Sequence, residues 1–294
     1  CHQRAGLCTK KTDCQIIKIN SKRIVMIKFF RHIRQRLIAD NRFSKYLLYA
    51  IGEIILVVIG ILIALQINNW NEHKKNAQQE QLILTQLLAE YESNLQQIES
   101  KISLRNDVVK SCITLLNYIH KRPQNITTDS VDYHLSRATM RPTFDPQLGV
   151  SNELINAGKL YLIDNTTLRN RISSYSSFLK ELNEEELNIF RFTEEEFYAF
   201  LIDQYQIGGF TTQFLFDEEL RSRFTIGESL SDFSGLKNLV PKANFENLLN
   251  HPNFEDHITR LLGMTPYTNE QSIGVRNKTQ EIIDLITSET AENQ

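Results

Sequence analysis

The sequence predicts an all-α protein in which one transmembrane helix continues into a long stalk helix, followed by an extracytoplasmic helical bundle. The 294 residues include only 11 Gly and 6 Pro, and an apolar run of 21 residues lies at positions 47–67. Beyond this run, apolar residues recur at alternating spacings of four and three, which is typical of a helix with one buried face. Because 41% of the residues are hydrophobic, collagen-like, proline-rich and disordered classes are excluded.

The first 25 residues carry three of the four cysteines, Cys1, Cys8 and Cys14, at spacings that fit neither a CxxC redox pair nor a zinc site. Met26 opens a coherent segment, MIKFFRHIRQRL. Residues 1–25 are therefore interpreted as a disordered or wrongly assigned N-terminal extension. A lipidated first cysteine is the weaker alternative, since a lipoprotein does not usually need the membrane span that follows.

The segment 26–45 is basic and amphipathic. Its cations include Lys28, Arg31, Arg34 and Arg36, which are the candidate contacts with the inner membrane leaflet. Two interpretations stay open. The segment is either a short interfacial helix, held by about 1 kcal/mol per cation near anionic lipid, or a basic flank without a further role.

Residues 46–70 are predicted to form the transmembrane helix. The run LLYAIGEIILVVIGILIALQI has the length of a bilayer core, about 31 Å at 1.5 Å per residue. Its fourteen Leu, Ile and Val residues favour insertion by roughly 4 to 8 kcal/mol, whereas its one acid costs about 3. A buried core helix and a cleaved signal peptide are the alternatives, and the length of the run and the lack of an A-x-A site disfavour the latter.

The distribution of cations predicts the orientation of this helix. Six Lys and Arg residues lie between Met26 and Lys45, whereas only Lys74 and Lys75 occur in the twenty residues after Asn71. The positive-inside rule therefore places the N-terminus in the cytoplasm and the rest of the chain outside it.

Glu53, Gly60 and Ala64 fall on one face of the predicted span. The Gly60-xxx-Ala64 pair is a small-xxx-small pattern, so this face is a candidate surface for packing against another helix. In the alternative interpretation the span begins a few residues later, and Glu53 lies near the inner headgroups.

Residues 71–122 are predicted to form a coiled-coil-like stalk helix that ends before Pro123. Its apolar seam runs from Leu84 to Ile119 and is interrupted only by Arg105. The seam fits either a parallel homodimer or one helix of a bundle within the chain. Extra apolar residues beside the seam widen it and favour the bundle, with Cys112 as a small core residue.

Residues 123–288 are predicted to form the rest of the bundle, and residues 289–294 a polar tail. The expected elements are helices at about 129–139 and 150–156 and a long helix that is capped by Asn165 and runs on to Tyr205 before Gly208-Gly209 end it. Irregular packing with short helices is expected over 210–241, followed by helices at about 243–262 and 269–288. No segment has the pattern of a strand.

No catalytic, cofactor-binding or metal-binding residue is predicted, because the chain has no GxxxxGK[ST], GxGxxG, HExxH, GxSxG or paired CxxC motif. The acidic triplets 184–186 and 194–196 are interpreted as a solvated helix face rather than a cation site. In HPNFEDH, His251 and His257 flank two acids, and an acid-rich helix N-terminus explains this cluster more simply than a metal does.

The run MIKFFRHIRQRLIADNRFSKYLLYAIGEIILVVIGILIALQINNWNEHKK closely resembles the N-terminal signature of an uncharacterised single-pass membrane protein family common in Bacteroidota. The later segment NELINAGKLYLIDNTTLRNRISSY is also similar to that family. The resemblance implies a bacterial inner-membrane anchor with a helical periplasmic domain. It implies no activity.

The function expected from the sequence is that of a scaffold or accessory interaction protein rather than an enzyme. Its expected partners are the lipid bilayer and a second copy or another envelope protein, bound through the span or the bundle. A net charge of −2 gives no reason to expect nucleic acid. The alternative is a ligand sensor or signal relay that works through a partner, because the short cytoplasmic segment holds no output domain.

Overall fold

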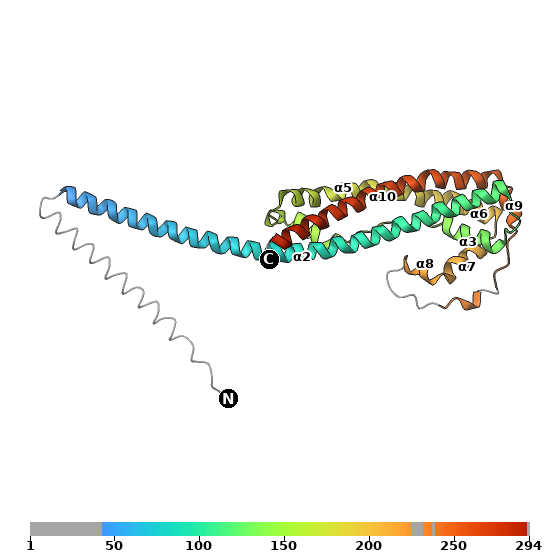
Figure 1. Cartoon of the computed structure of the whole chain (residues 1–294), viewed down its shortest axis with the longest axis horizontal. Helices are drawn as coiled ribbons and strands as arrows, with labels where there is room; N and C mark the ends of the chain where they lie inside the picture. Colours follow the sequence, from blue (N-terminus) through green and yellow to red (C-terminus); the bar gives the residue numbers. More distant parts are fainter. Residues whose placement is uncertain (1–42, 225–231, 237–238, 293–294) are drawn as a thin grey trace, which may run out of the picture. The chain divides into compact units, whose positions relative to one another are not determined.

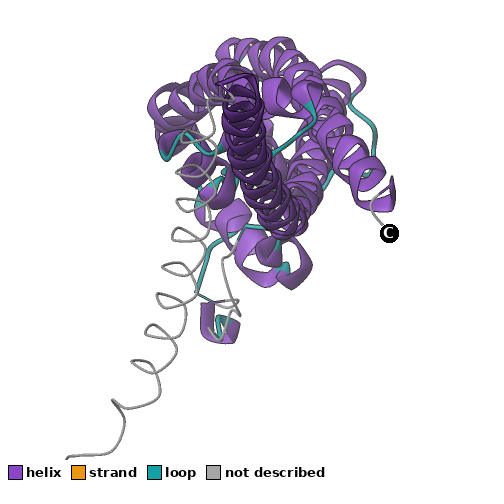
Figure 2. Ribbon diagram, turned by 90° about the vertical axis from the view of Figure 1, so that its left-hand side faces the viewer, coloured by secondary structure: helices purple, strands orange, loops and turns teal. Residues whose placement is uncertain are grey.

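The computed structural model describes residues 43–224, 232–236 and 239–292, and within these ranges it contains helices and loops but no strand (Figure 1, Figure 2). The prediction of an all-α chain is confirmed for this part of the molecule. The extension 1–25 and most of the basic segment 26–45 lie outside the described residues. Contacts divide the chain between Lys75 and Asn76 into two units, and each is described by itself.

Helix α2 spans Phe43–Lys121 and contains the whole apolar run. Within this run Leu48 is 77% exposed and Leu56 is 72% exposed, and none of its most apolar residues is buried by other described parts of the chain. This helix is therefore long and apolar enough to cross a membrane.

The second unit contains the rest of α2 and all later helices. These helices are α3 (Thr128–Ala138), α4 (Gly149–Asn156), the 3₁₀ helix η1 (Leu160–Leu162), α5 (Thr166–Arg191), the π-helix η2 (Phe192–Phe197), α6 (Tyr198–Gln204), α7 (Gly208–Phe216), α8 (Glu218–Ser222), the 3₁₀ helix η3 (Ser234–Leu236), α9 (Phe245–Leu249) and α10 (Pro252–Glu292).

Several helix ends lie where local chemistry predicts them. Helix α2 ends before Pro123, and Arg122, at φ 47°, is the one non-glycine residue with positive φ among those described. Asn165 caps α5 by accepting a hydrogen bond from the backbone N–H of Leu168 at 2.9 Å. Gly158 follows α4 at φ 64°, in the left-handed conformation that glycine adopts without strain.

The seam of α2 is buried within the single chain. Its residues Leu84, Tyr91 and Ile98 have no exposed surface, and they belong to a core cluster with apolar side chains of α4, α5 and α10. Cys112 is also fully buried, as expected, and burial raises the pKa of its thiol to about 12. The buried face is broader than the seam, because Leu87 and other residues beside it are buried too.

A second core cluster lies toward the C-terminal end of α2. It joins Leu104 and Leu115 of α2 to side chains of α3, α6, α7, α9 and the first turns of α10. Helices α3 and α7 pack directly on each other in this cluster, so elements separated by about seventy residues form one wall.

The long helix ends at Gln204, close to the predicted Tyr205, but Gly208 and Gly209 do not end it, because they begin α7. A Cβ on Gly208 would lie 2.7 Å from Val240 Cγ1, and one on Gly209 would lie 2.1 Å from Asp132 Oδ2. The glycines therefore allow the N-terminus of α7 to approach the buried Asp132 carboxylate, where the helix dipole favours negative charge.

The prediction of separate helices at about 243–262 and 269–288 is also wrong. A short helix, α9, precedes Pro252, and α10 continues through Pro266. Residues on both sides of this proline, such as Leu261 and Ser272, are buried where α10 packs against the core. This packing outweighs the lost backbone hydrogen bond, since tertiary contacts supply most of the stability of a protein helix.

We expect Gly209→Ala to lower the free energy of unfolding by about 1–3 kcal/mol, because the new methyl group must displace Asp132. Urea denaturation of the full chain in detergent, followed by circular dichroism, measures the change. Gly274→Ala is the matched control: no atom lies within 4 Å of its added Cβ, so a gain of about 0.5–1 kcal/mol is expected. Equal effects of the two substitutions would contradict the close approach.

Candidate functional site

A buried ion pair holds the loop 139–148 between α3 and α4. Arg105 of α2 is 1% exposed and forms an ion pair with Glu186 of α5. The guanidinium also donates hydrogen bonds to Ser272 Oγ at 2.5 Å and to the carbonyl oxygen of Pro142 at 3.0 Å. The Glu186 carboxylate accepts hydrogen bonds from the backbone N–H of Phe144 at 3.0 and 3.2 Å. One ion pair thus joins three long helices and the loop.

Burial dominates the electrostatics of this pair. Desolvation raises the pKa of Glu186, and the Arg105 charge and the Phe144 N–H oppose that rise. Desolvation also lowers the pKa of Arg105, and the Glu186 carboxylate opposes this. Each buried charge is therefore stabilised by the opposite charge of its partner.

Two further polar residues of α2, Asn94 and Glu90, form hydrogen bonds with the end of the loop 139–148 and with the start of α4. The side chain of Asn94 exchanges two hydrogen bonds with the backbone of Gln147. Its NH₂ group donates to the backbone carbonyl oxygen at 2.7 Å, and its Oδ1 accepts from the backbone N–H at 2.8 Å. The Glu90 carboxylate accepts from the N–H groups of Val150 and Ser151 at the N-terminus of α4, at 2.6 and 3.1 Å. These contacts satisfy backbone groups that would otherwise be buried without a partner.

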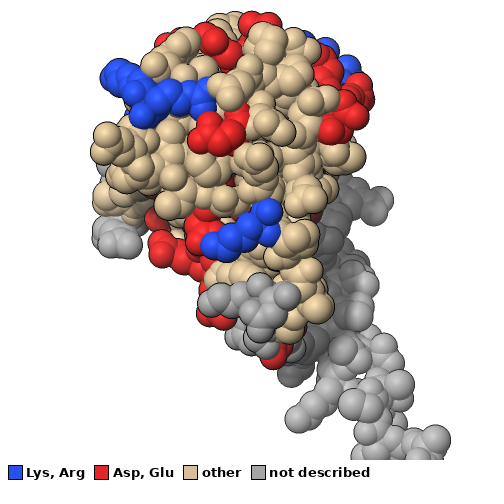
Figure 3. All heavy atoms as spheres, turned by 90° about the vertical axis from the view of Figure 1, so that its right-hand side faces the viewer, with Lys and Arg blue, Asp and Glu red and all other residues tan. Residues whose placement is uncertain are grey.

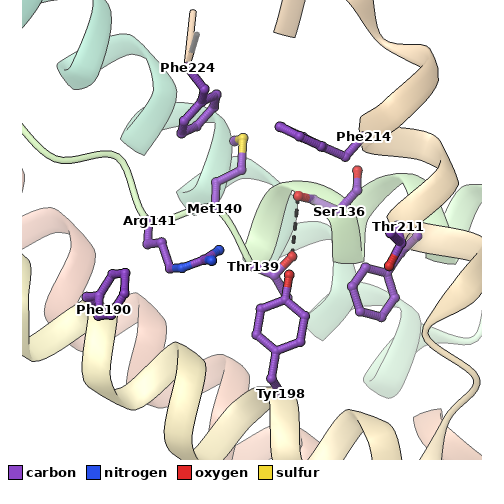
Figure 4. Close-up of a pocket in the computed structure, with 10 residues that line it drawn as sticks. Ser136, Thr139, Met140, Arg141, Phe190, Tyr198, Thr211, Phe214 and Phe224 are labelled. Atoms are coloured by element: carbon purple, nitrogen blue, oxygen red, sulfur yellow. Dashed lines mark hydrogen bonds between the residues drawn. The ribbon is translucent and has the colours of Figure 1, made fainter. Parts of the chain in front are cut away.

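The anchored loop forms one wall of a pocket of about 430 Å³ (Figure 4). The other walls come from α3, the helix formed by α5, η2 and α6, and α7. Five apolar side chains line the pocket: Met140, Phe190, Phe210, Phe214 and Phe224. Its polar side chains are Ser136, Thr139, Arg141, Tyr198 and Thr211. The volume and the largely apolar lining are those of a small-molecule site.

Arg141 is the charged group of this pocket. Its guanidinium forms an ion pair with Glu194, and its centre lies 5.4 Å from the ring centroid of Phe190 and 5.7 Å from that of Tyr198. Its Nε is buried and has no hydrogen-bond partner among the described residues. In Figure 4 the guanidinium extends toward the hydroxyl groups of Thr139 and Tyr198.

The π-helix η2 places two of the groups that surround Arg141. It interrupts what the sequence predicts as one regular helix. It carries Glu194 and is followed directly by Tyr198, the first residue of α6. Thr193, in the same turn, is fully buried, and its Oγ1 has no hydrogen-bond partner among the described residues. π-Turns of this kind occur frequently at functional sites.

A second hollow, the α4 groove, has a volume of about 230 Å³ and is formed by α2, α4 and the chain around η1. Leu82 and Tyr161 line it and are 61% and 68% exposed. Val150, Leu154 and other apolar side chains form its floor. Polar or charged side chains line it as well, so the groove is an exposed surface of mixed apolar and polar character: Gln79, Gln86, Glu153 and Lys159.

The residues that the sequence singled out have different positions. Glu53, Gly60 and Ala64 lie in the apolar part of α2, and no described atom of the chain lies within 4 Å of a Cβ built on Gly60. That packing face stays a prediction. The candidate leaflet contacts Lys28, Arg31, Arg34 and Arg36 lie outside the described residues.

The acidic triplets are only partly a solvated face. Glu186 is 3% exposed and pairs with Arg105, which corrects the interpretation of the first triplet. In the second triplet Glu194 pairs with Arg141, and Glu196 pairs with Arg260 at 2.6 Å. Figure 3 likewise shows acidic and basic side chains intermixed on the face it presents.

The histidines of HPNFEDH lie beside aromatic rings. The ring centroid of Phe200 is 5.0 Å from that of His251 and 4.7 Å from that of His257. Glu255 lies in the first turn of α10, which agrees with an acid-rich helix N-terminus. In the part of the chain that the structure describes, no group of three or more His, Cys, Asp or Glu residues is arranged to hold a metal ion.

Sequence reasoning identified Arg105 as an interruption of the seam but did not find the pocket. A charged residue in an apolar seam is a signal for a buried partner, and Glu186 was not distinguishable from its acidic neighbours. Arg141, Thr139 and Tyr198 have no common pattern in the sequence, because two of them come from the loop 139–148 and the third comes from the distant helix α6.

Comparison with known proteins places part of the chain in context. A model described as a family of unknown function (DUF6090) matches residues 53–179, from Glu53 in α2 to Leu179 in α5. All residues that line the α4 groove lie in this segment, whereas Phe190, Tyr198 and the α7 residues of the pocket lie beyond it. No curated protein and no solved structure matches the chain.

We expect Arg105→Met to cost about 3–5 kcal/mol of unfolding free energy, since it leaves the Glu186 carboxylate buried without its counterion. The double variant Arg105→Met/Glu186→Gln should recover at least half of that loss, because the glutamine oxygen still accepts from Phe144 N–H. Urea denaturation measures both. Arg260→Met, whose ion pair is half exposed, is the control and should cost no more than about 1 kcal/mol. If Arg105→Met alone lost no more unfolding free energy than Arg260→Met, the proposed anchoring role would be refuted.

Burial lowers the pKa of His257, partly opposed by the Glu196 carboxylate. The unfolded chain, with an ordinary histidine pKa of about 6.5, therefore binds the proton more readily than the folded chain. The stability associated with neutral His257 is therefore fully present above a pH of about 6.5. It is lost as the pH falls from that value toward the lowered pKa of the folded chain. We expect the melting temperature of His257→Phe relative to that of wild type to rise as the pH is lowered from 7.5 to 5.5. Parallel curves of melting temperature against pH for His257→Phe and wild type would refute the assignment.

Proposed function

We propose that the chain is a membrane-anchored scaffold or accessory protein, with its N-terminus in the cytoplasm and its helical domain in the periplasm of a bacterial inner membrane. The observation that carries the anchor is the apolar part of α2, whose side chains are exposed on every face and would be covered by lipid. Basic residues before this run and few after it support the orientation.

The aromatic residue after the apolar run fits the same arrangement. Trp70 is 68% exposed, and Lys74 Nζ lies 5.9 Å from the centroid of its ring. Tryptophan is enriched at the membrane–water interface, where its ring is apolar and its N–H meets water. Trp70 therefore supports an end of the span close to Asn71.

The α4 groove supports a role in protein interaction. Its exposed Leu82 and Tyr161 lie over an apolar floor, and a segment of another envelope protein with apolar side chains would bury both. Because the groove is shallow and about 230 Å³ in volume, it fits one or two anchoring side chains better than a whole ligand.

A ligand sensor that acts through a partner is the second candidate function. The pocket beside Arg141 favours it, since polar side chains from the loop, α3 and α6 converge on a cavity of about 430 Å³. The two candidates use different surfaces of the same unit.

Site-specific photocrosslinking in living cells tests the scaffold role. We expect a photoreactive amino acid at position 161 to yield a crosslinked product of one defined mass, and Leu82→Asp to reduce its yield at least fivefold because the acid disrupts the apolar contact. Position 267 is the control, since Tyr267 is also half exposed but lies outside the groove. The same products at both positions, or no product at position 161, would reject the groove as an interaction surface.

A further inference from the structure

The pocket beside Arg141 has a polar side and an apolar side. In Figure 4 the Arg141 guanidinium and the hydroxyl groups of Thr139 and Tyr198 lie together, and Met140, Phe214 and Phe224 lie across the cavity from Tyr198. We infer that this pocket binds a small amphiphilic carboxylate, in which one acid group is joined to a compact ring system. The inference rests on the second candidate function and specifies its ligand.

The polar side of the pocket offers hydrogen-bond donors. The buried Nε–H of Arg141 has no acceptor among the described residues, which is unfavourable for a hydrogen-bond donor. The Tyr198 hydroxyl is the second donor on this side. Thr139 and Ser136 already donate to the carbonyl oxygens of Leu135 and Tyr133, at 2.9 and 2.8 Å, so both can only accept. Two donors on one side require an acceptor group, and a carboxylate accepts from both.

The charge of the pocket favours a monoanion. Glu194 already neutralises part of the Arg141 charge, and the nearby Arg137 is paired with Asp217 at 2.5 Å. A phosphate dianion would therefore meet too little positive charge, while a cation would face the guanidinium directly. A single carboxylate can share Arg141 with Glu194, because the guanidinium presents five N–H donors.

The apolar side indicates a flat ring system for the rest of the ligand. Phe214 and Phe224 have ring centroids 5.9 Å apart at an interplanar angle of 72°, and Phe210 is 1% exposed beneath the cavity. Aromatic side chains bind rings through offset and edge contacts in addition to burial. The cavity of about 430 Å³ lies in the usual range for small-molecule sites, and a fused pair of rings fits within it.

Calorimetric titration of the full chain in phosphatidylcholine nanodiscs tests this inference, with empty nanodiscs subtracted. The probes are 1-naphthaleneacetate, its neutral amide 1-naphthaleneacetamide, and acetate. We expect saturable binding of 1-naphthaleneacetate at one site per chain, at least tenfold tighter than the amide, and no saturable binding of acetate. Lack of saturation by the acid, or equal affinity for acid and amide, would overturn the inference.

Two conservative variants locate the binding in this pocket. Tyr198→Phe removes only the hydroxyl and should weaken the binding of 1-naphthaleneacetate at least threefold. Arg141→Lys keeps the charge near Glu194 but should weaken this binding about tenfold, because it loses the Nε–H. Tyr267→Phe, at a half-exposed position outside both the pocket and the α4 groove, is the matched control and should leave the affinity unchanged. If Tyr198→Phe binds like the control, the site is elsewhere and the inference fails. Crosslinking at position 161 is independent of this result, so failure here does not decide the scaffold role.

Discussion

The Arg105–Glu186 ion pair is the interaction on which the rest of the folded unit depends. Its two charges lie on α2 and α5, and their remaining hydrogen bonds reach Ser272 on α10 and the backbone of the loop between α3 and α4. A buried pair of this kind contributes little net stability compared with apolar residues, but it is costly to break. Its partners lie on three helices and one loop, so all of its hydrogen bonds are satisfied only when these elements are correctly aligned.

The loop that this pair anchors is also a wall of the pocket. Pro142 and Phe144 are bound to the ion pair, so the position of Arg141, directly before Pro142, follows from the core rather than from the surface. The π-helix η2 carries Glu194, which pairs with Arg141, and it is followed directly by Tyr198, whose hydroxyl group lies on the same side of the cavity as the guanidinium. The pocket is thus supported by the interior of the domain, as a binding site that keeps its shape requires.

The described residues present three surfaces of different chemistry. The apolar part of α2 suits lipid, the α4 groove suits an apolar side chain of another protein, and the pocket suits a small molecule with a polar end. The family model matches the segment that contains most of the apolar run and all of the groove, but it ends before Phe190 and Tyr198 of the pocket.

The sequence by itself determined the helical class, the apolar run and several helix ends, because periodicity, caps and prolines act over a few neighbouring residues. Asn165, Gly158 and Pro123 illustrate this, as does the burial of Cys112 on the seam. Tertiary structure alone decided that Gly208 and Gly209 begin a helix, that α10 continues through Pro266, and that Glu186 is buried while Glu184 is exposed. Each of these outcomes depends on a partner distant in sequence: Asp132 and Val240 for the glycines, the core around α10 for the proline, and Arg105 for the glutamate. Local patterns cannot show which distant group will be the neighbour, and the pocket depends on several such neighbours at once.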